Sequence, residues 1–134
     1  GDAGMKVLDR LEEILIATLI AAATLLIFVS VAQRYSLDLA ASKLLANADR
    51  WLDDVVFSRD VIDLAMMRPR LPLLRKALSK AEQAYGTAAR RDLGRAIDRL
   101  AERTGWLERC MQAMAIRVPK ALLWQRIRAL RRVL

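Results

Sequence analysis

Histidine is absent from this sequence of 134 residues, and cysteine occurs once, at Cys110. These two residue types supply most zinc ligands, thiol–imidazole pairs and histidine general bases. A single cysteine also excludes a disulfide within the chain, so the sequence gives no sign of an oxidising compartment. There is no phosphate-cradling glycine loop and no Gly-x-Ser-x-Gly elbow. Most enzyme classes lack their usual side chains here, and we predict a noncatalytic protein without a cofactor or a metal ion.

Aromatic residues are also few, at 5%, whereas hydrophobic residues make up 55% of the chain. The apolar content comes from Leu, Ala, Ile, Val and Met, which favour a helix or tolerate one in lipid. We therefore predict an all-α fold. A single transmembrane helix would precede amphipathic helices that form a small helical bundle or hairpin.

Charge is missing from residues 14–32, which read ILIATLIAAATLLIFVSVA. At about 1.5 Å per residue this run spans roughly 28 Å, close to the roughly 30 Å hydrocarbon core of a bilayer. Arg34 and Tyr35 follow it, and a long cation and a phenol both suit the headgroup level. We predict a transmembrane helix here, with Arg34 and Tyr35 in contact with the membrane surface.

Two other interpretations of this apolar run stay open. A soluble protein would bury it as a core helix, although the remainder of the chain is small for covering all its faces. A cleaved signal peptide would have a shorter apolar stretch and fewer acids before it. The chain starts with Gly1 and its first methionine is Met5, so we expect an upstream targeting sequence or expression tag to have been removed.

The basic surplus lies wholly after the apolar run. The formal charge of the chain is +8, and residues 37–134 hold 20 Lys and Arg against 11 Asp and Glu, a net charge of +9. Such a surplus suggests an anionic partner. Because the chain has a candidate anchor, we predict anionic lipid headgroups rather than nucleic acid. No small-molecule substrate is indicated.

Amphipathic patterns fill the rest of the chain. Apolar residues recur at three- and four-residue spacing from Leu44 to Val56, which predicts a helix. The prolines within residues 68–72 must interrupt it, and a further helix is expected over 73–85. From Leu93 the spacing alternates between four and three, the heptad pattern of a coiled coil, with a hinge expected at Thr104 and Gly105. The predicted helix-packing residues of this seam are Leu93, Ile97, Leu100, Leu107, Met111 and Met114.

Pro119 marks the start of the last predicted helix, which has no acidic residue. Its cations stand opposite an apolar stripe, as in helices that lie on anionic membrane surfaces. A solvated helix of the bundle is the alternative. The predicted membrane or lipid contacts in this region are Arg117, Lys120, Trp124, Arg126, Arg128, Arg131 and Arg132.

Carboxylates are dense only between residues 49 and 63, at Asp49, Asp53, Asp54, Asp60 and Asp63. Paired carboxylates can bind a metal ion or share a proton. These acids alternate with arginines, however, and we predict a solvated helix face. Cys110 follows Arg109, which could lower its pKa, but a packed side chain is the favoured interpretation.

The stretch Leu8-Asp9-Arg10-Leu11-Glu12-Glu13, followed by the apolar run and Arg34-Tyr35, resembles the first membrane helix of the small membrane subunit of tripartite ATP-independent periplasmic (TRAP) transporters. The resemblance implies a transport-related subunit with four membrane helices. Nothing after Tyr35 approaches an uncharged stretch of 18 residues, so the later spans of that family have no counterpart here. No substrate-binding residue is carried over.

Together these patterns predict a noncatalytic accessory or assembly subunit of a larger membrane complex, with other membrane-protein subunits as partners. Ala17 and Ala21 would let a neighbouring helix approach closely in lipid. The alternative is a basic helical nucleic-acid-binding module whose apolar helix is a buried core helix. We expect a single-pass protein with its C-terminal part on the cytoplasmic or matrix side. The expected parts are an N-terminal flank (1–13), a transmembrane helix (14–35), an amphipathic segment (36–68) and a helical domain (73–134).

Overall fold

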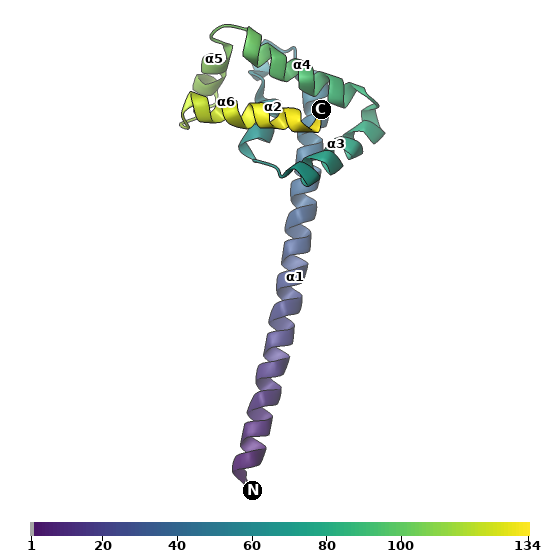
Figure 1. Cartoon of the computed structure of the whole chain (residues 1–134), viewed down its shortest axis with the longest axis vertical. Helices are drawn as coiled ribbons and strands as arrows, with labels where there is room; N and C mark the ends of the chain where they lie inside the picture. Colours follow the sequence, from purple (N-terminus) through teal and green to yellow (C-terminus); the bar gives the residue numbers. More distant parts are fainter. Residues whose placement is uncertain (1) are drawn as a thin grey trace. The chain divides into compact units, whose positions relative to one another are not determined.

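The computed structural model describes residues 2–134, and all regular secondary structure within that range is helical (Figure 1). The predicted all-α fold class is confirmed. Contacts divide the chain into two compact units, Gly1–Ser36 and Leu37–Leu134. The elements in chain order are α1 (Asp2–Arg50), η1 (Asp54–Val56), α2 (Arg59–Met66), α3 (Leu71–Tyr85), α4 (Ala88–Glu102), α5 (Trp106–Ala113), α6 (Lys120–Ala129) and η2 (Leu130–Val133).

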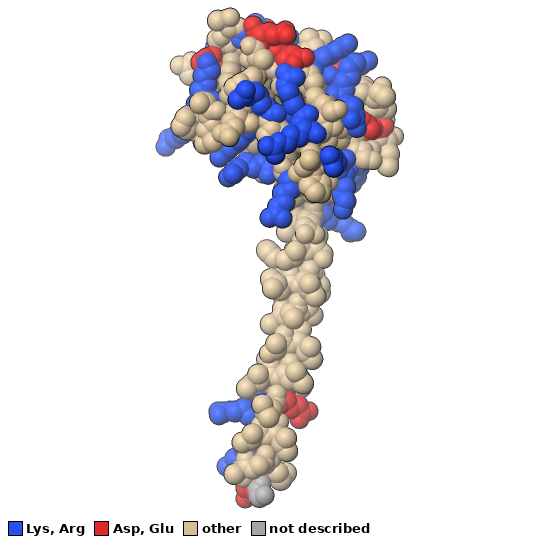
Figure 2. Space-filling model, in the orientation of Figure 1, with Lys and Arg blue, Asp and Glu red and all other residues tan. Residues whose placement is uncertain are grey.

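The first unit consists of the N-terminal part of α1. Its large apolar side chains between Ile14 and Val31 are 42–70% exposed, and no charged side chain interrupts this stretch (Figure 2). The Thr18 hydroxyl donates a hydrogen bond to the Ile14 carbonyl oxygen at 2.7 Å, so this polar group is satisfied within the helix. Among the described residues, α1 is the one helix long and apolar enough to cross a membrane.

The helix expected to run to Val56 ends earlier, at Arg50. The Asp53 backbone is extended, and its carboxylate accepts a hydrogen bond from the Val55 amide at 2.9 Å. This local bond competes with helix continuation, which explains why the apolar spacing alone was misleading. Val55 is consequently 81% exposed instead of lying on a packed helix face.

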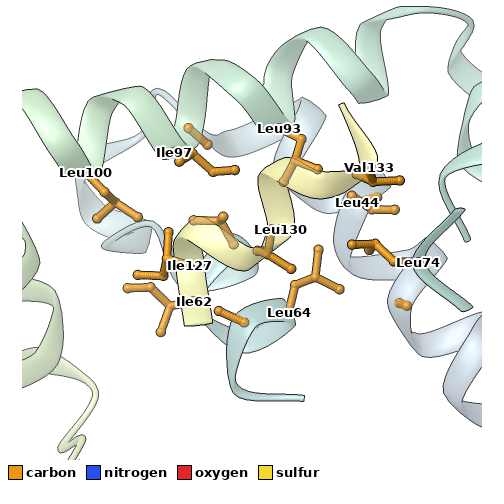
Figure 3. Packing of buried hydrophobic residues seen from close by; sticks show 14 of the residues in the cluster. Leu44, Ile62, Leu64, Leu74, Leu93, Ile97, Leu100, Ile127, Leu130 and Val133 are labelled. Carbon is orange, nitrogen blue, oxygen red and sulfur yellow. The ribbon is translucent and has the colours of Figure 1, made fainter. Parts of the chain in front are cut away.

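The core of the second unit is built from leucine and isoleucine side chains that point toward one another (Figure 3). Helix α6 packs on α2, and η2 packs on α3. Each fully buried leucine or isoleucine contributes about 1.5–3 kcal/mol. The fully buried side chains include Leu44, Ile62, Leu64, Leu74, Leu93, Ile97, Ile127 and Leu130.

The heptad pattern from Leu93 to Val118 does not form one continuous helix. Helix α4 ends at Glu102, and α5 begins at Trp106 after Gly105, which has a φ of +73°. The expected coiled coil is therefore not observed in residues 2–134. Instead, the seam bends back so that both helices line the core.

The two proline-containing breaks lie where the sequence placed them. Helix α2 ends at Met66, and α3 begins at Leu71, two residues earlier than expected. Pro72 lies in the first turn of α3, where a missing backbone donor costs nothing. Pro119 is the residue before α6. Between α2 and α3, Arg68 has a φ of +49°, a conformation that residues other than glycine rarely adopt.

Candidate membrane anchor and basic pocket

The predicted contact residues of the anchor are all exposed within their own unit. Tyr35 is 68% exposed, and Arg34, Ala17 and Ala21 are exposed as well. Ala17 and Ala21 are four residues apart in α1 and so lie on the same face, one turn from each other. Because alanine side chains are small, a second helix can approach this face closely.

The predicted packing seam lies inside the second unit. Leu93, Ile97, Leu100 and Leu107 are buried, whereas Met111 and Met114 are half-buried against the same core. The chain covers this seam with its own helices.

The carboxylates at residues 49–63 are solvated only in part, since Asp49, Asp53 and Asp54 are exposed but Asp60 is not. Asp60 is only 3% exposed and accepts hydrogen bonds from Arg50 Nε at 2.9 Å and Arg50 Nη2 at 2.6 Å. Asp63 accepts one from Lys43 at 2.7 Å. Asp60 departs from the prediction because α2 packs beside the end of α1, which takes this carboxylate out of water and supplies its counterions.

A second polar cluster joins the segment after α1 to the α4–α5 junction. Asp54 accepts hydrogen bonds from Arg103 at 2.8 and 3.2 Å and forms an ion pair with Arg99. The Arg103 guanidinium beside it holds the pKa of the Asp54 carboxyl below its usual range. Trp106 Nε1 donates to Ser58 Oγ at 2.9 Å, and Arg103 lies 4.3 Å from the Trp106 ring centre. The polar groups of this cluster find their hydrogen-bond and ion-pair partners in one another, so we assign the cluster a structural role.

Cys110 is completely buried. Burial raises the pKa of its thiol to about 11, and the opposing effects of Ser58 and nearby arginines do not offset this. A thiol in this state is a poor nucleophile and a poor metal ligand. Within residues 2–134 no group of three or more His, Cys, Asp or Glu side chains could hold a metal ion.

The cations of the terminal helix separate into two sets. Lys120 pairs with Glu108, and Arg131 pairs with Asp98. Arg126, Arg128 and Arg132 instead line a depression of about 510 Å³, together with Arg68 from the α2–α3 linker. Figure 2 shows Lys and Arg side chains gathered over the face on which α6 runs. Trp124 is half-buried, with the Arg128 guanidinium 5.9 Å from its ring centre.

Sequence reasoning missed Arg68 as part of this basic pocket. Its Arg-Pro-Arg context was interpreted only as a helix break, because nothing local shows that a linker faces a helix nearly sixty residues later. The signal available in the sequence was the absence of any acid near Arg68 and its neighbour Arg70. Arg117, the remaining predicted contact, is exposed.

Comparison with known proteins finds one informative match. A stretch of 37 residues is 60% identical to the C4-dicarboxylate TRAP transporter small permease protein DctQ of Rhodobacter capsulatus. The similarity is to one part of a transporter subunit. It covers 28% of this chain and 16% of the permease. No protein-family model matches the chain, and no solved structure matches it.

The permease match and the exposed apolar helix together support a membrane location for this chain. The match agrees with the resemblance that the N-terminal motif showed. It extends over far less than the full permease, so the permease's transport role is not transferred by the match itself.

Proposed function

We propose that the chain is a noncatalytic single-pass membrane subunit, which serves as an accessory or assembly component of a larger, transport-related membrane complex. The observation that carries this proposal is the 60% identity to a TRAP transporter small permease over 37 residues. The uncharged, exposed apolar segment of α1 is the physical feature that fits it.

A role through contact follows from the shape of the anchor. One transmembrane helix cannot enclose a transport path, and substrate sites in transporters lie between several helices. A transport-related role for this chain therefore requires partner subunits in the membrane. Ala17 and Ala21 give the anchor a face of small residues on which a partner helix can pack.

The exposure of the apolar helix favours a membrane anchor over the alternative of a soluble nucleic-acid-binding module. That alternative required the apolar helix to be buried in a core, yet the large apolar side chains from Ile14 to Val31 are 42–70% exposed. Exposing so much apolar surface to water is strongly unfavourable, so the segment needs lipid or protein around it.

The interfacial contacts remain part of the proposal. Arg34 and Tyr35 would sit at the headgroup level at the end of the span. Of the terminal-helix cations, Lys120 and Arg131 are engaged with acids of their own unit, which leaves Arg117, Arg126, Arg128 and Arg132 for anionic headgroups. The positive second unit would lie on the cytoplasmic or matrix side.

A fractionation and copurification experiment tests the proposal. The chain should stay with membranes after a carbonate wash and should bring other membrane subunits with it from mild detergent. Replacing Ala17 and Ala21 together by isoleucine should keep the chain in the membrane but reduce copurification about tenfold, because branched side chains hold a partner helix away. Replacing Leu15 and Leu19 by isoleucine is the matched control and should leave copurification unchanged.

Two results would contradict the proposal. Release of the chain by carbonate would refute the anchor. Unchanged copurification by the double-isoleucine variant at Ala17 and Ala21, or a chain that copurifies with nothing, would refute the proposed contact role.

A further inference from the structure

The basic pocket has positively charged walls and an apolar floor. Its volume is about 510 Å³, and its walls carry Arg68, Arg126, Arg128 and Arg132. Leu74 and Leu130, both almost fully buried, contribute to the floor. None of the residues that line it is acidic. Four guanidinium groups thus surround one opening without an anion of the protein's own.

The arginines of this pocket have no counterion from the part of the protein that the structure describes. Within residues 2–134, none of the four arginines has a carboxylate oxygen within 4.0 Å. Other cations of the same region do, since Arg131 pairs with Asp98 and Lys120 with Glu108. Acids are therefore available on this unit, but they are directed to residues outside the pocket.

Arg126 is the clearest case of an arginine in this pocket that lacks a good hydrogen-bond acceptor. It is half-buried, and in the described part of the chain its Nη1 donates only to the Met66 sulfur, at 3.7 Å. Its Nε is buried without any hydrogen-bond partner there. A thioether is a weak acceptor, and a buried guanidinium nitrogen without a hydrogen-bond partner is costly. An anion bound in the pocket would supply the missing acceptor.

We propose that the basic pocket binds the phosphate group of an anionic ligand, through the guanidinium groups of Arg68, Arg126, Arg128 and Arg132. Guanidinium matches phosphate oxygens in a planar two-point geometry, and charge-assisted bonds of this kind are the strong ones. A phosphomonoester carries about −1.5 to −2 charges and three acceptor oxygens. One carboxylate carries a single charge and two oxygens, so a phosphate group places more charge and more acceptors within reach of one cluster of arginines.

The apolar floor makes a phosphate ester a better fit than a bare ion. Leu122, which is 37% exposed, stands at the pocket beside the buried leucines and can contact the organic part of the ligand. Two sources share this chemistry, a phospholipid headgroup and a soluble phosphate. The site deepens the proposed function, on whose interfacial contacts at Arg126, Arg128 and Arg132 it rests, by adding Arg68 and a phosphate group as the ligand.

Calorimetric titration of the full chain in a neutral maltoside detergent tests the site. The probes are monomeric dihexanoyl phosphatidic acid, inorganic phosphate and succinate, each in a buffer without other multivalent anions. The phosphate-bearing probes should bind saturably in the micromolar to millimolar range. The double variant Arg128→Gln/Arg132→Gln should weaken this binding by about tenfold or more, since it removes two charge-assisted partners.

Arg95→Gln/Arg109→Gln is the matched control. Arg95 makes no ion pair in the described range, like Arg132, and Arg109 lies 6.0 Å from the Trp106 ring centre as Arg128 lies 5.9 Å from that of Trp124. This variant removes the same charge outside the pocket and should leave the affinity within about twofold. Should the first double variant unfold, Arg68→Gly replaces it, because glycine fits the φ of +49° without strain.

The probes also separate the two sources. Phosphatidic acid that binds tenfold more tightly than inorganic phosphate supports a lipid headgroup, and equal affinities support a soluble phosphate. Absence of saturable binding of both phosphate probes up to about 10 mM would overturn the proposal. So would equal weakening by the pocket and control variants, or succinate binding as tight as phosphate. A pocket variant that still copurifies with its membrane partners would leave the proposed subunit role intact.

Discussion

At the scale of single residues, the reactivity of Cys110 is set by burial. Its thiol is fully enclosed, and its pKa is raised to about 11. At pH 8 the thiolate fraction is then about a hundredfold smaller than for a thiol at the ordinary value of 9.0. We expect iodoacetamide to modify folded Cys110 at least that much more slowly than the unfolded chain, measured by intact-mass spectrometry over time.

An exposed cysteine provides the comparison for this measurement. Gln112 is exposed on the same helix, so a Gln112→Cys variant in a Cys110→Ser background should react at the rate of an ordinary thiol. Folded and unfolded Cys110 reacting within tenfold of each other would show that the thiol is accessible.

Asp54 connects side-chain geometry to the pH dependence of stability. Its pKa lies below the ordinary value of 3.8 in the folded protein, chiefly because Arg103 donates hydrogen bonds to it. As the pH falls below 3.8, the unfolded chain takes up a proton first, so stability that is present at neutral pH is lost. An Asp54→Asn variant should therefore lose less stability than the natural protein between pH 4 and pH 2.5.

Tryptophan emission during urea unfolding measures this difference. Trp51, Trp106 and Trp124 all lie in the second unit, so the signal does not report on the apolar part of α1. Glu102→Gln is the control, because Glu102 makes no ion pair in the described residues. If Asp54→Asn lost stability with falling pH as steeply as the natural protein, the Asp54–Arg103 pair would not contribute as described.

Asp60 shows why the burial of a charged residue was harder to predict than the burial of apolar residues. Its neighbours Val61 and Ile62 are apolar, and both are buried. Nothing in the sequence showed that Asp60 would be buried with them. The counterion Arg50 is ten residues away on another helix, and only the packing of α2 beside the end of α1 brings the two charges together.

At the scale of elements, glycine decides whether the heptad pattern continues as a helix. Gly105 has a φ of +73° and separates α4 from α5, whereas Gly94 lies within α4. We expect Gly105→Ala to destabilise the second unit by about 1–2 kcal/mol, because a Cβ is disfavoured at positive φ. Gly94→Ala should stabilise it by about 0.5–1 kcal/mol, since alanine is the better helix former.

The two glycine substitutions are a matched pair, because they are expected to change the free energy of unfolding in opposite directions. A Cβ at Gly105 would meet nothing within 4 Å, so its cost is conformational; one at Gly94 would meet Leu134 Cδ1 at 3.4 Å, an ordinary contact. Urea unfolding followed by tryptophan emission measures both free energies. Stabilisation by Gly105→Ala would mean that α4 and α5 can merge into the single helix that the spacing suggested.

Along the chain, the apolar periodicity predicted that a helix is present better than it predicted where that helix ends. The helices at 71–85 and 120–129 lie close to their predicted positions, because prolines mark their starts. The helix ends at Arg50 and Glu102 were set by other means, a carboxylate that caps η1 and a left-handed glycine. The capping carboxylate and the glycine each end a helix although the apolar pattern in the sequence continues beyond that point.

At the scale of the whole molecule, the apolar run was predictable and the pocket was not. An uncharged stretch between Ile14 and Ala32 is visible in the sequence alone, since its signal is local. The basic pocket joins Arg68 to Arg132, from a linker and the last helical turn. Such a site exists only after α6 and η2 have packed against α2 and α3.

The distribution of positive charge leads to a prediction about topology. Lys6 and Arg10 precede the apolar run, whereas Arg34, Lys43 and Arg50 follow it, and residues 37–134 carry a net charge of +9. Lys and Arg near the ends of a span are retained on the cytoplasmic or matrix side, and acids contribute little to this preference. The second unit should therefore lie on that side.

Cysteine labelling in membrane vesicles of known orientation can test this topology. Ser79 is exposed on α3, so a Ser79→Cys variant in a Cys110→Ser background presents one accessible thiol on the second unit. A membrane-impermeant maleimide should label it in inverted vesicles and not in right-side-out ones, because the unit and its surplus of cations stay on the cytoplasmic side. Gly4→Cys in the same background reports the other end of the span and should give the reverse pattern. Labelling of Ser79→Cys from outside, with Gly4→Cys protected, would place the basic unit on the opposite side and would remove anionic lipids of the cytoplasmic leaflet as its partner.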